Sequence, residues 1–164
     1  MPQSRRERPR VAATLGQRLL AAGFALSISA GAAAGDLLRV SGAWAPPTVP
    51  GQSVGAIYLQ LRSAQEAALV RIETDAAATA EIHQMTMESD VMRMRRLDVL
   101  ELPAGQAVEL APGAQHVMLV GLRHPVKAGD SVKLVLTVRL RNGGTVRETV
   151  VVPVVPKAGH GSHR

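Results

Sequence analysis

Cysteine is absent from this chain of 164 residues. Without thiols there can be no disulfide bond, no thiolate metal site and no cysteine nucleophile. A blue-copper electron-transfer centre is also excluded, because such a centre requires a cysteine thiolate. Thiols pair or oxidise in an oxidising compartment, so the composition suits a protein that is exported from the cytoplasm.

Aromatic residues are nearly absent as well, with one tryptophan, one tyrosine and one phenylalanine in the whole chain. The hydrophobic fraction is nevertheless 46%, and the length is sufficient for one domain with a core of its own. That core must be built almost entirely from Val, Leu, Ile and Ala.

Basic charge is not concentrated in the part of the chain expected to fold. The formal net charge is +6, of which residues 1–34 contribute +4 and residues 35–164 only +2. Nucleic-acid surfaces combine clustered basic groups with stacking aromatic side chains. The densest basic group, Arg93, Arg95 and Arg96, is interpreted as a solvated strand edge. We therefore expect no nucleic-acid partner.

The chain also lacks a hydrophobic run long enough to span a bilayer, which takes roughly 20 residues. Residues 19–34 are apolar and small, follow an arginine-rich start and end in Ala32-Ala33-Ala34. This order is typical of a secretory signal peptide. We predict a signal peptide over residues 1–34, cleaved after Ala34 or, as an alternative, after Ala32. The protein would then be periplasmic, without stable membrane insertion; an uncleaved anchor is the alternative interpretation.

The segment 35–155 is predicted to be one all-β domain. Short β-rich runs alternate with Gly, Pro and polar turns, a pattern that favours an antiparallel sandwich over the alternative of a small closed barrel. Asn142-Gly143-Gly144 predicts a hairpin turn, since Asn and Gly accept positive φ. The expected strands cover residues 37–44, 54–62, 68–73, 80–87, 91–97, 107–110, 116–122, 131–140 and 145–154.

The last residues, 156–164, are polar and glycine-containing and are predicted to form a flexible tail. His160 and His163 lie in this tail. A flexible pair of imidazoles can bind Cu(II) weakly, and a solvated tail without metal is the alternative.

Histidine and methionine are concentrated in one short region. Five of the six methionines lie between His83 and a position just past His116, whereas residues 35–82 and 119–164 contain none. Methionines that merely fill a core would not cluster in this way. The thioether is a soft, neutral ligand that suits Cu(I), so this region is a candidate copper site.

The spacing of these residues predicts which side chains share a face. Residues two apart in a strand point to the same side, so His116 and Met118 form one such pair. If the strands around residues 80–87, 91–97 and 116–122 meet, one end of the sandwich presents two imidazoles and two thioethers, a set that Cu(I) accepts in roughly tetrahedral geometry. The predicted metal ligands are His83, Met94, His116 and Met118. Met85, Met87 and Met92 are interpreted either as a soft rim of this site or as packing.

These residues carry a resemblance to a known family. His83 is followed by ten residues and Met94, then by twenty-one residues and His116-x-Met118. This pattern, together with the flanking segments EIHQMTMESDVMRMR and LPAGQAVELAPGAQHVMLVGL, resembles the periplasmic copper chaperones of the PCuAC type. The resemblance covers residues 37–155 and is weakest just after Trp44, where many relatives carry Arg and a longer polar stretch.

The resemblance implies a cupredoxin-like antiparallel Greek-key β-sandwich that binds one Cu(I) near its surface. It further implies delivery of copper to the CuA centre in subunit II of cytochrome c oxidase, alone or with a Sco-type thiol protein. Such a protein would be a monomeric carrier and not an enzyme. Neutral imidazoles and thioethers bind Cu(I) less strongly than thiolates, so copper would pass toward a cysteine-bearing acceptor.

Other functions remain as alternatives. Copper storage or tolerance would use the same ligands without a delivery partner. An adhesion or fimbrial-type sandwich would bind no metal. Hydrolytic chemistry has little support, because the chain has neither a His-Glu-x-x-His motif nor a cysteine nucleophile.

Overall fold

The computed structural model describes residues 37–156, and its elements there are β-strands. The predicted signal peptide and the tail histidines His160 and His163 lie outside the described residues. Within the described range no helix has the length and apolarity needed to cross a membrane. The strands are β1 Leu38–Trp44, β2 Val54–Ser63, β3 Ala67–Thr74, β4 Ala77–Glu88, β5 Val91–Leu97, β6 Leu100–Leu102, β7 Ala107–Leu110, β8 Gln115–Leu122, β9 Ser131–Leu140 and β10 Thr145–Pro153.

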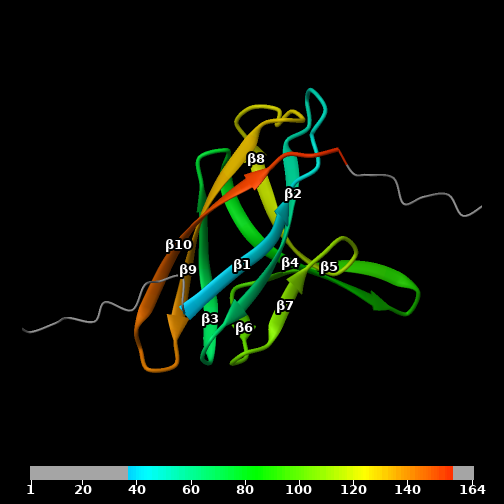
Figure 1. Cartoon of the computed structure of the whole chain (residues 1–164). Coiled ribbons are helices and arrows are strands. Elements are labelled where there is room, and N and C mark those ends of the chain that lie inside the picture. Colours follow the sequence, from blue (N-terminus) through cyan, green and yellow to red (C-terminus); the bar gives the residue numbers. More distant parts are fainter. Residues whose placement is uncertain (1–36, 157–164) are drawn as a thin grey trace, which may run out of the picture. The chain divides into compact units, whose positions relative to one another are not determined.

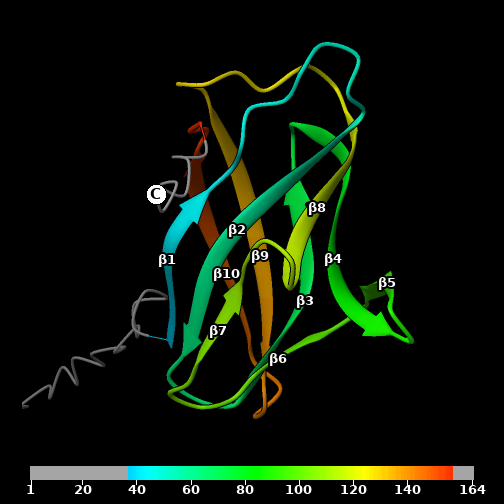
Figure 2. The same ribbon diagram turned by 90° about the vertical axis from the view of Figure 1, so that its right-hand side faces the viewer.

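The strands form two sheets rather than one closed barrel, which confirms the predicted antiparallel sandwich (Figure 1). One sheet has six strands in the order β1-β2-β8-β4-β5, with β7 also paired to β2. The other has four strands in the order β10-β9-β3-β6. Figure 2 shows the second sheet behind the first, with β5 at the far edge of the larger sheet.

The core between the sheets is aliphatic, as the lack of aromatic residues required. In β9, Val132, Leu134, Leu136 and Val138 are almost completely buried, and the alternation of strand side chains sends all of them to one face. Each such side chain contributes about 1.5–3 kcal/mol when it leaves water. Burial of this repeated apolar face fixes the register of β9 against β3 and β10.

Nine of the ten strands were predicted from the sequence, with boundaries that differ by a few residues. The missing one, β6, has three residues and pairs with Ala67–Leu69 of β3, which is too short for a period-two pattern to be recognised. The turn around Asn142 was predicted correctly, because Gly143 has φ +87° and its amide donates to the carbonyl of Leu140.

The hairpin of β4 and β5 matters most for the site. Pairing of β4 with β8 ends at Gln84 opposite Gln115, whereas pairing of β4 with β5 continues to Glu88 opposite Val91. The end of the hairpin is therefore a two-stranded ribbon that projects beyond the sheet (Figure 1). Ser89 and Asp90 close it, both with positive φ, as a type I′ turn requires.

Candidate metal site

His83 and His116 face each other directly on neighbouring strands. They are register partners in β4 and β8, and their ring centroids are 6.2 Å apart with 41° between the planes. Their chain neighbours Ile82 and Val117 are buried in the core. Because strand side chains alternate, the two imidazoles lie on the outer face of the six-stranded sheet, where β8 begins and the ribbon leaves the sheet.

Two aromatic rings extend this pair into a row across four strands. Tyr58 of β2 lies beside His116, with ring centroids 6.4 Å apart, and Trp44 of β1 pairs with Tyr58 at 4.7 Å. His116 is only 5% exposed although it is on the outer face. Burial raises the pKa of the Tyr58 hydroxyl. The sequence did not single out Trp44 and Tyr58 as part of the site, because their neighbours are set by the register of β1 and β2.

The two predicted thioether ligands lie on the same face, on either side of the histidine pair. Met118 is two residues beyond His116 in β8 and is the register partner of Glu81. Met94 of β5 is the register partner of Met85, which is two residues beyond His83 in β4. The structure therefore places all four predicted ligands on one face of three adjacent strands. Each methionine lies on a strand next to that of His83, diagonally opposite it.

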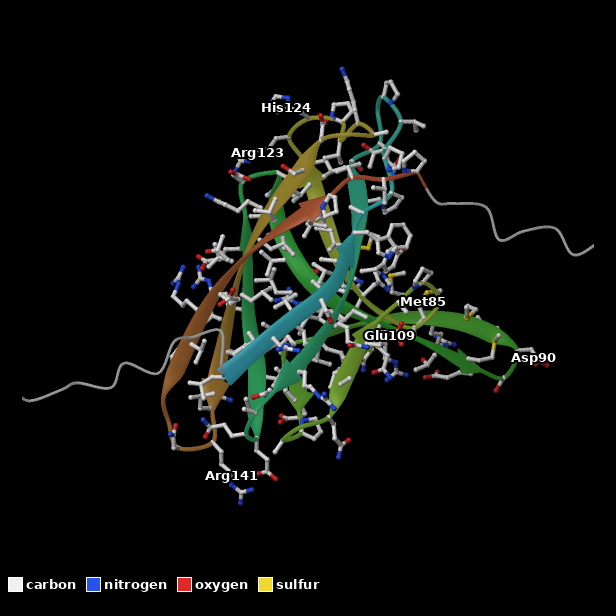
Figure 3. All side chains as sticks on the ribbon, viewed as in Figure 1. Met85, Asp90, Glu109, Arg123, His124 and Arg141 are labelled. Carbon is white, nitrogen blue, oxygen red and sulfur yellow. The ribbon has the colours of Figure 1, made fainter. Side chains whose placement is uncertain are left out.

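The remaining methionines share this face and do not fill the core. Met85 lies next to His83 at the base of the ribbon, and Met87 pairs with Met92 nearer the turn. Met87 is 64% exposed and Met92 is 52% exposed, so packing in the core does not account for them. Figure 3 shows Met85 near the base of the ribbon and Asp90 at its tip.

A carboxylate holds the ring of His83. The Nε2 atom lies 3.0 Å from Oε2 of Glu81, whose Oε1 lies 3.2 Å from Nη1 of Arg96. The hydrogen bond to His83, aided by the positive charge of Arg96, lowers the pKa of the Glu81 carboxyl below its usual range against the opposing effect of burial. An ionised carboxylate can only accept hydrogen bonds, so Nε2 of His83 carries the proton.

The proton on Nε2 leaves the lone pair of the neutral ring on Nδ1. This atom is buried and has no hydrogen-bond partner among the described residues, an unusual condition for a buried polar atom. Histidine ligands of metals commonly donate their other ring N–H to a carboxylate, which fixes tautomer and orientation. Glu81, His83 and an ion at Nδ1 would form that arrangement. Sequence reasoning missed Glu81, whose only signal was its position two residues before His83.

His116 is held in the complementary way. Its Nδ1 atom lies 3.3 Å from the backbone carbonyl oxygen of Ala114. A carbonyl accepts, so Nδ1 donates and Nε2 keeps the lone pair. Both histidines thus have one nitrogen fixed by an oxygen and the other available as a ligand, and the donor set fits Cu(I).

Harder ligands do not gather in the described part of the chain. No three side chains of His, Cys, Asp or Glu come close enough there to hold a metal ion. His124 lies apart from the histidine pair, after the end of β8 (Figure 3). A site at the histidine pair therefore depends on the thioethers for its further ligands.

Comparison with known sequences places the chain in a family. The family described as "Putative lipoprotein LpqE-like" matches residues 38–154. A relative from Leifsonia xyli subsp. xyli, named "Putative lipoprotein Lxx21020", is 30% identical over 125 residues, which are 76% of this chain and 73% of the relative.

Solved structures with the same fold include copper proteins. The structure of CuI-DR1885 from Deinococcus radiodurans is 28% identical, with a TM-score of 0.54 over 79% of this chain and 85% of that protein. The copper-bound PCuAC domain from PmoF2 has a TM-score of 0.58 over 73% of this chain and 92% of the domain. At 18% identity the second likeness concerns the fold alone.

The likeness to PCuAC domains confirms the predicted cupredoxin-like β fold. The family match spans every strand from β1 to β10. This chain belongs to the LpqE-like family, and it has the fold of the PCuAC domains.

Proposed function

We propose that this protein is a Cu(I) metallochaperone that delivers copper to the CuA centre of cytochrome c oxidase. The observation that carries the proposal is the pair of facing imidazoles, His83 and His116, each with one nitrogen held by an oxygen. Nδ1 of His83, Nε2 of His116 and the sulfur atoms of Met94 and Met118 would hold the ion. The structure of CuI-DR1885, at 28% identity, supports the choice of metal.

The chemistry of the ligands favours Cu(I) over other ions. Thioethers are soft donors, and an imidazole–thioether set brings no negative charge that would favour a harder divalent cation. The same neutrality limits the affinity, so an acceptor with thiolate ligands would take the ion. The carrier would bind and release copper without catalysing a reaction.

The exposure of the four side chains suggests the order of release. His116 is 5% exposed, whereas Met94 is 47% exposed on an edge strand. An incoming ligand from the acceptor would replace Met94 first, while the histidines still hold the ion. We propose CuA-bearing subunit II as the acceptor, with a Sco-type thiol protein as an additional partner, and a monomeric carrier.

Export would bring the protein to this acceptor. We propose that residues 1–34 direct the chain to the periplasm and are removed there. The name lipoprotein of the family is not carried over to this chain, because attachment of lipid through a thioether needs a cysteine and the sequence contains none. Weak Cu(II) binding by His160 and His163 stays a prediction.

A competition titration of residues 35–164 with Cu(I) under reducing conditions tests the site. We expect one tightly bound ion, and we expect the His83→Ala and Met118→Ala variants to lose tight binding. His124→Ala is the matched control, since His124 is exposed and lies apart from the pair. Unchanged affinity in the first two variants would show that the site is wrong.

Delivery is tested separately in cells that lack the protein. We expect CuA loading to fall under copper limitation and to recover with the wild-type chain but not with His83→Ala. Normal loading in the deletion strain, together with intact Cu(I) binding in vitro, would contradict delivery and leave storage or tolerance as the function.

A further inference from the structure

Four methionines form a ladder along the projecting ribbon. Met85 pairs with Met94, and Met87 pairs with Met92, across β4 and β5. Directly opposed residues in an antiparallel pair have Cβ atoms about 4.5–5.5 Å apart. A methionine side chain has three rotatable bonds and a terminal thioether that adapts to its surroundings, so each pair can bring two sulfur atoms to one ion. We call these four residues the thioether ladder.

The ladder is continuous with the histidine pair. His83, Met85 and Met87 are alternate residues of β4 and point to one face, with steps of about 6.6 Å between them. Met94 belongs both to the ladder and to the proposed histidine site. An ion at the outer pair, Met87 and Met92, would therefore lie next to the pair Met85 and Met94. Met94 is already a ligand of the proposed histidine site.

The exposure of the ladder rises toward its tip. Met85 is half-buried beside the sheet, whereas Met92 and Met87 are more than half exposed. Large exposed apolar side chains are a liability on a two-stranded edge. Four of the eight large exposed hydrophobic residues in the described range lie on this one hairpin: Met87, Val91, Met92 and Met94. Stability gives no reason for this placement, because these side chains bury little.

The ribbon is nevertheless held in one register. On the face opposite the methionines, Glu88 of β4 binds Arg93 at 3.2 Å and Arg95 at 2.8 Å, both in β5. The two-residue turn at Ser89 and Asp90 aligns the strands. Arg93 and Arg95 thus lie on the face away from the thioethers. Arg96 lies on the thioether face next to Met94, but its charge is paired with Glu81.

We propose that Met87 and Met92 form a second Cu(I) site, through which copper enters and leaves the histidine site by way of Met85 and Met94. This inference rests on the proposed function. Two neutral thioethers bind more weakly than two imidazoles with two thioethers, so the outer site exchanges its ion readily. Along the ladder one thioether replaces another, and at the histidine site the imidazole nitrogens replace thioethers of the ladder. Copper remains Cu(I) throughout, so no oxidant or reductant takes part.

The competing explanation is an apolar patch that docks a protein partner. Replacing both outer methionines by leucine separates the two, because leucine keeps the apolar surface and removes the sulfur. The test uses the Met87→Leu/Met92→Leu double variant of residues 35–164. Val91→Leu is the matched control, since it changes an exposed apolar residue of the same hairpin that lies on the opposite face.

Binding is measured with Cu(I) and with Ag(I), a soft ion that is stable in air, by mass spectrometry and by NMR of the methionine methyl groups. We expect the wild type and Val91→Leu to take a second, weaker equivalent that shifts the methyl signals of Met87 and Met92. The double variant should lose this equivalent, keep the first at unchanged affinity, and release Cu(I) more slowly to a thiolate chelator in stopped-flow mixing.

The outcomes separate this inference from the proposed function. A double variant that keeps the second equivalent, or that releases copper as fast as the wild type, would overturn the outer site and favour docking. A wild type that binds one ion, with no shift of the outer methyl signals, would also overturn it while leaving the chaperone intact. A wild type that binds no Cu(I) at all would overturn the proposed function itself.

Discussion

The histidine pair and the methionine ribbon are two parts of one surface that are built in opposite ways. The pair lies on the packed sheet, with His116 buried beside Tyr58 and His83 held by Glu81. The ribbon extends past the last residue of β4 that pairs with β8, and its methionines are largely exposed. One region fixes its nitrogen atoms before an ion arrives, and the other leaves its sulfur atoms free to move.

This contrast assigns different tasks to the two regions. Ligands whose rings are already oriented lose little conformational freedom on binding, which favours affinity. Flexible exposed thioethers give up more freedom, but they can be approached by ligands of an acceptor. We therefore expect substitutions at the histidine pair to change the equilibrium affinity, and substitutions in the ribbon to change the rate of exchange.

The largest effect is expected from His116→Ala. This change removes a nitrogen ligand from the most buried position of the proposed site, so tight Cu(I) binding should be lost. A competition titration measures the affinity, and fluorescence offers a second measurement because Trp44 is the only tryptophan and its ring lies against Tyr58, beside His116. Copper should alter this fluorescence in the wild type and not in the variant.

Circular dichroism provides the control for His116→Ala, since a variant that fails to fold would also lose copper. A folded variant with wild-type affinity would contradict the assignment of His116 as a ligand. His124→Ala should behave as the wild type in both measurements.

A smaller effect is expected from Glu81→Ala, which leaves all four proposed ligands in place. Removal of a group that orients a metal ligand typically weakens binding about 10–100-fold, because the ring of His83 is then free to change tautomer and rotate. Glu81→Gln should recover part of the loss, since its amide oxygen can still accept from Nε2. Both affinities are measured by the same titration.

Glu88→Gln is the matched control for Glu81, because Glu88 pairs with two arginines on the ribbon and touches neither histidine. We expect its Cu(I) affinity to match that of the wild type. Tighter binding in Glu81→Ala would contradict the supporting role and would mean that Glu81 competes with copper for His83.

The shared face of the predicted ligands could be read from the sequence, whereas the surroundings of the histidine pair could not. His116-x-Met118 and the strand positions of His83 and Met94 follow from the period of two, which requires no knowledge of distant residues. The row of rings from Trp44 to His83 depends on the order β1-β2-β8-β4, which brings residues far apart in sequence side by side. Local patterns do not contain that order.

Glu81 was missed for a different reason. A glutamate two residues before a histidine in a strand is usually solvated, and only the burial of Nδ1 of His83 and the approach of Arg96 distinguish this one. The exposed ribbon was also not predicted, because a Ser-Asp turn is a much weaker hairpin signal than Asn-Gly. How far the ribbon extends beyond the sheet depends on where β8 begins, which the sequence of β4 and β5 does not specify.

The smallest effect is expected from the double change Ser89→Asn and Asp90→Gly at the tip of the ribbon. Both residues have positive φ, a conformation that costs about 1–2 kcal/mol per ordinary residue and that Asn-Gly adopts readily. The ribbon should become better ordered and the free energy of unfolding should rise by about 1 kcal/mol or less, measured by chemical denaturation. The affinity for Cu(I) should not change, because the histidine pair is oriented by the packed sheet. A change as large as that caused by Glu81→Ala would mean instead that the geometry of the ribbon, through Met94, sets how tightly copper is held.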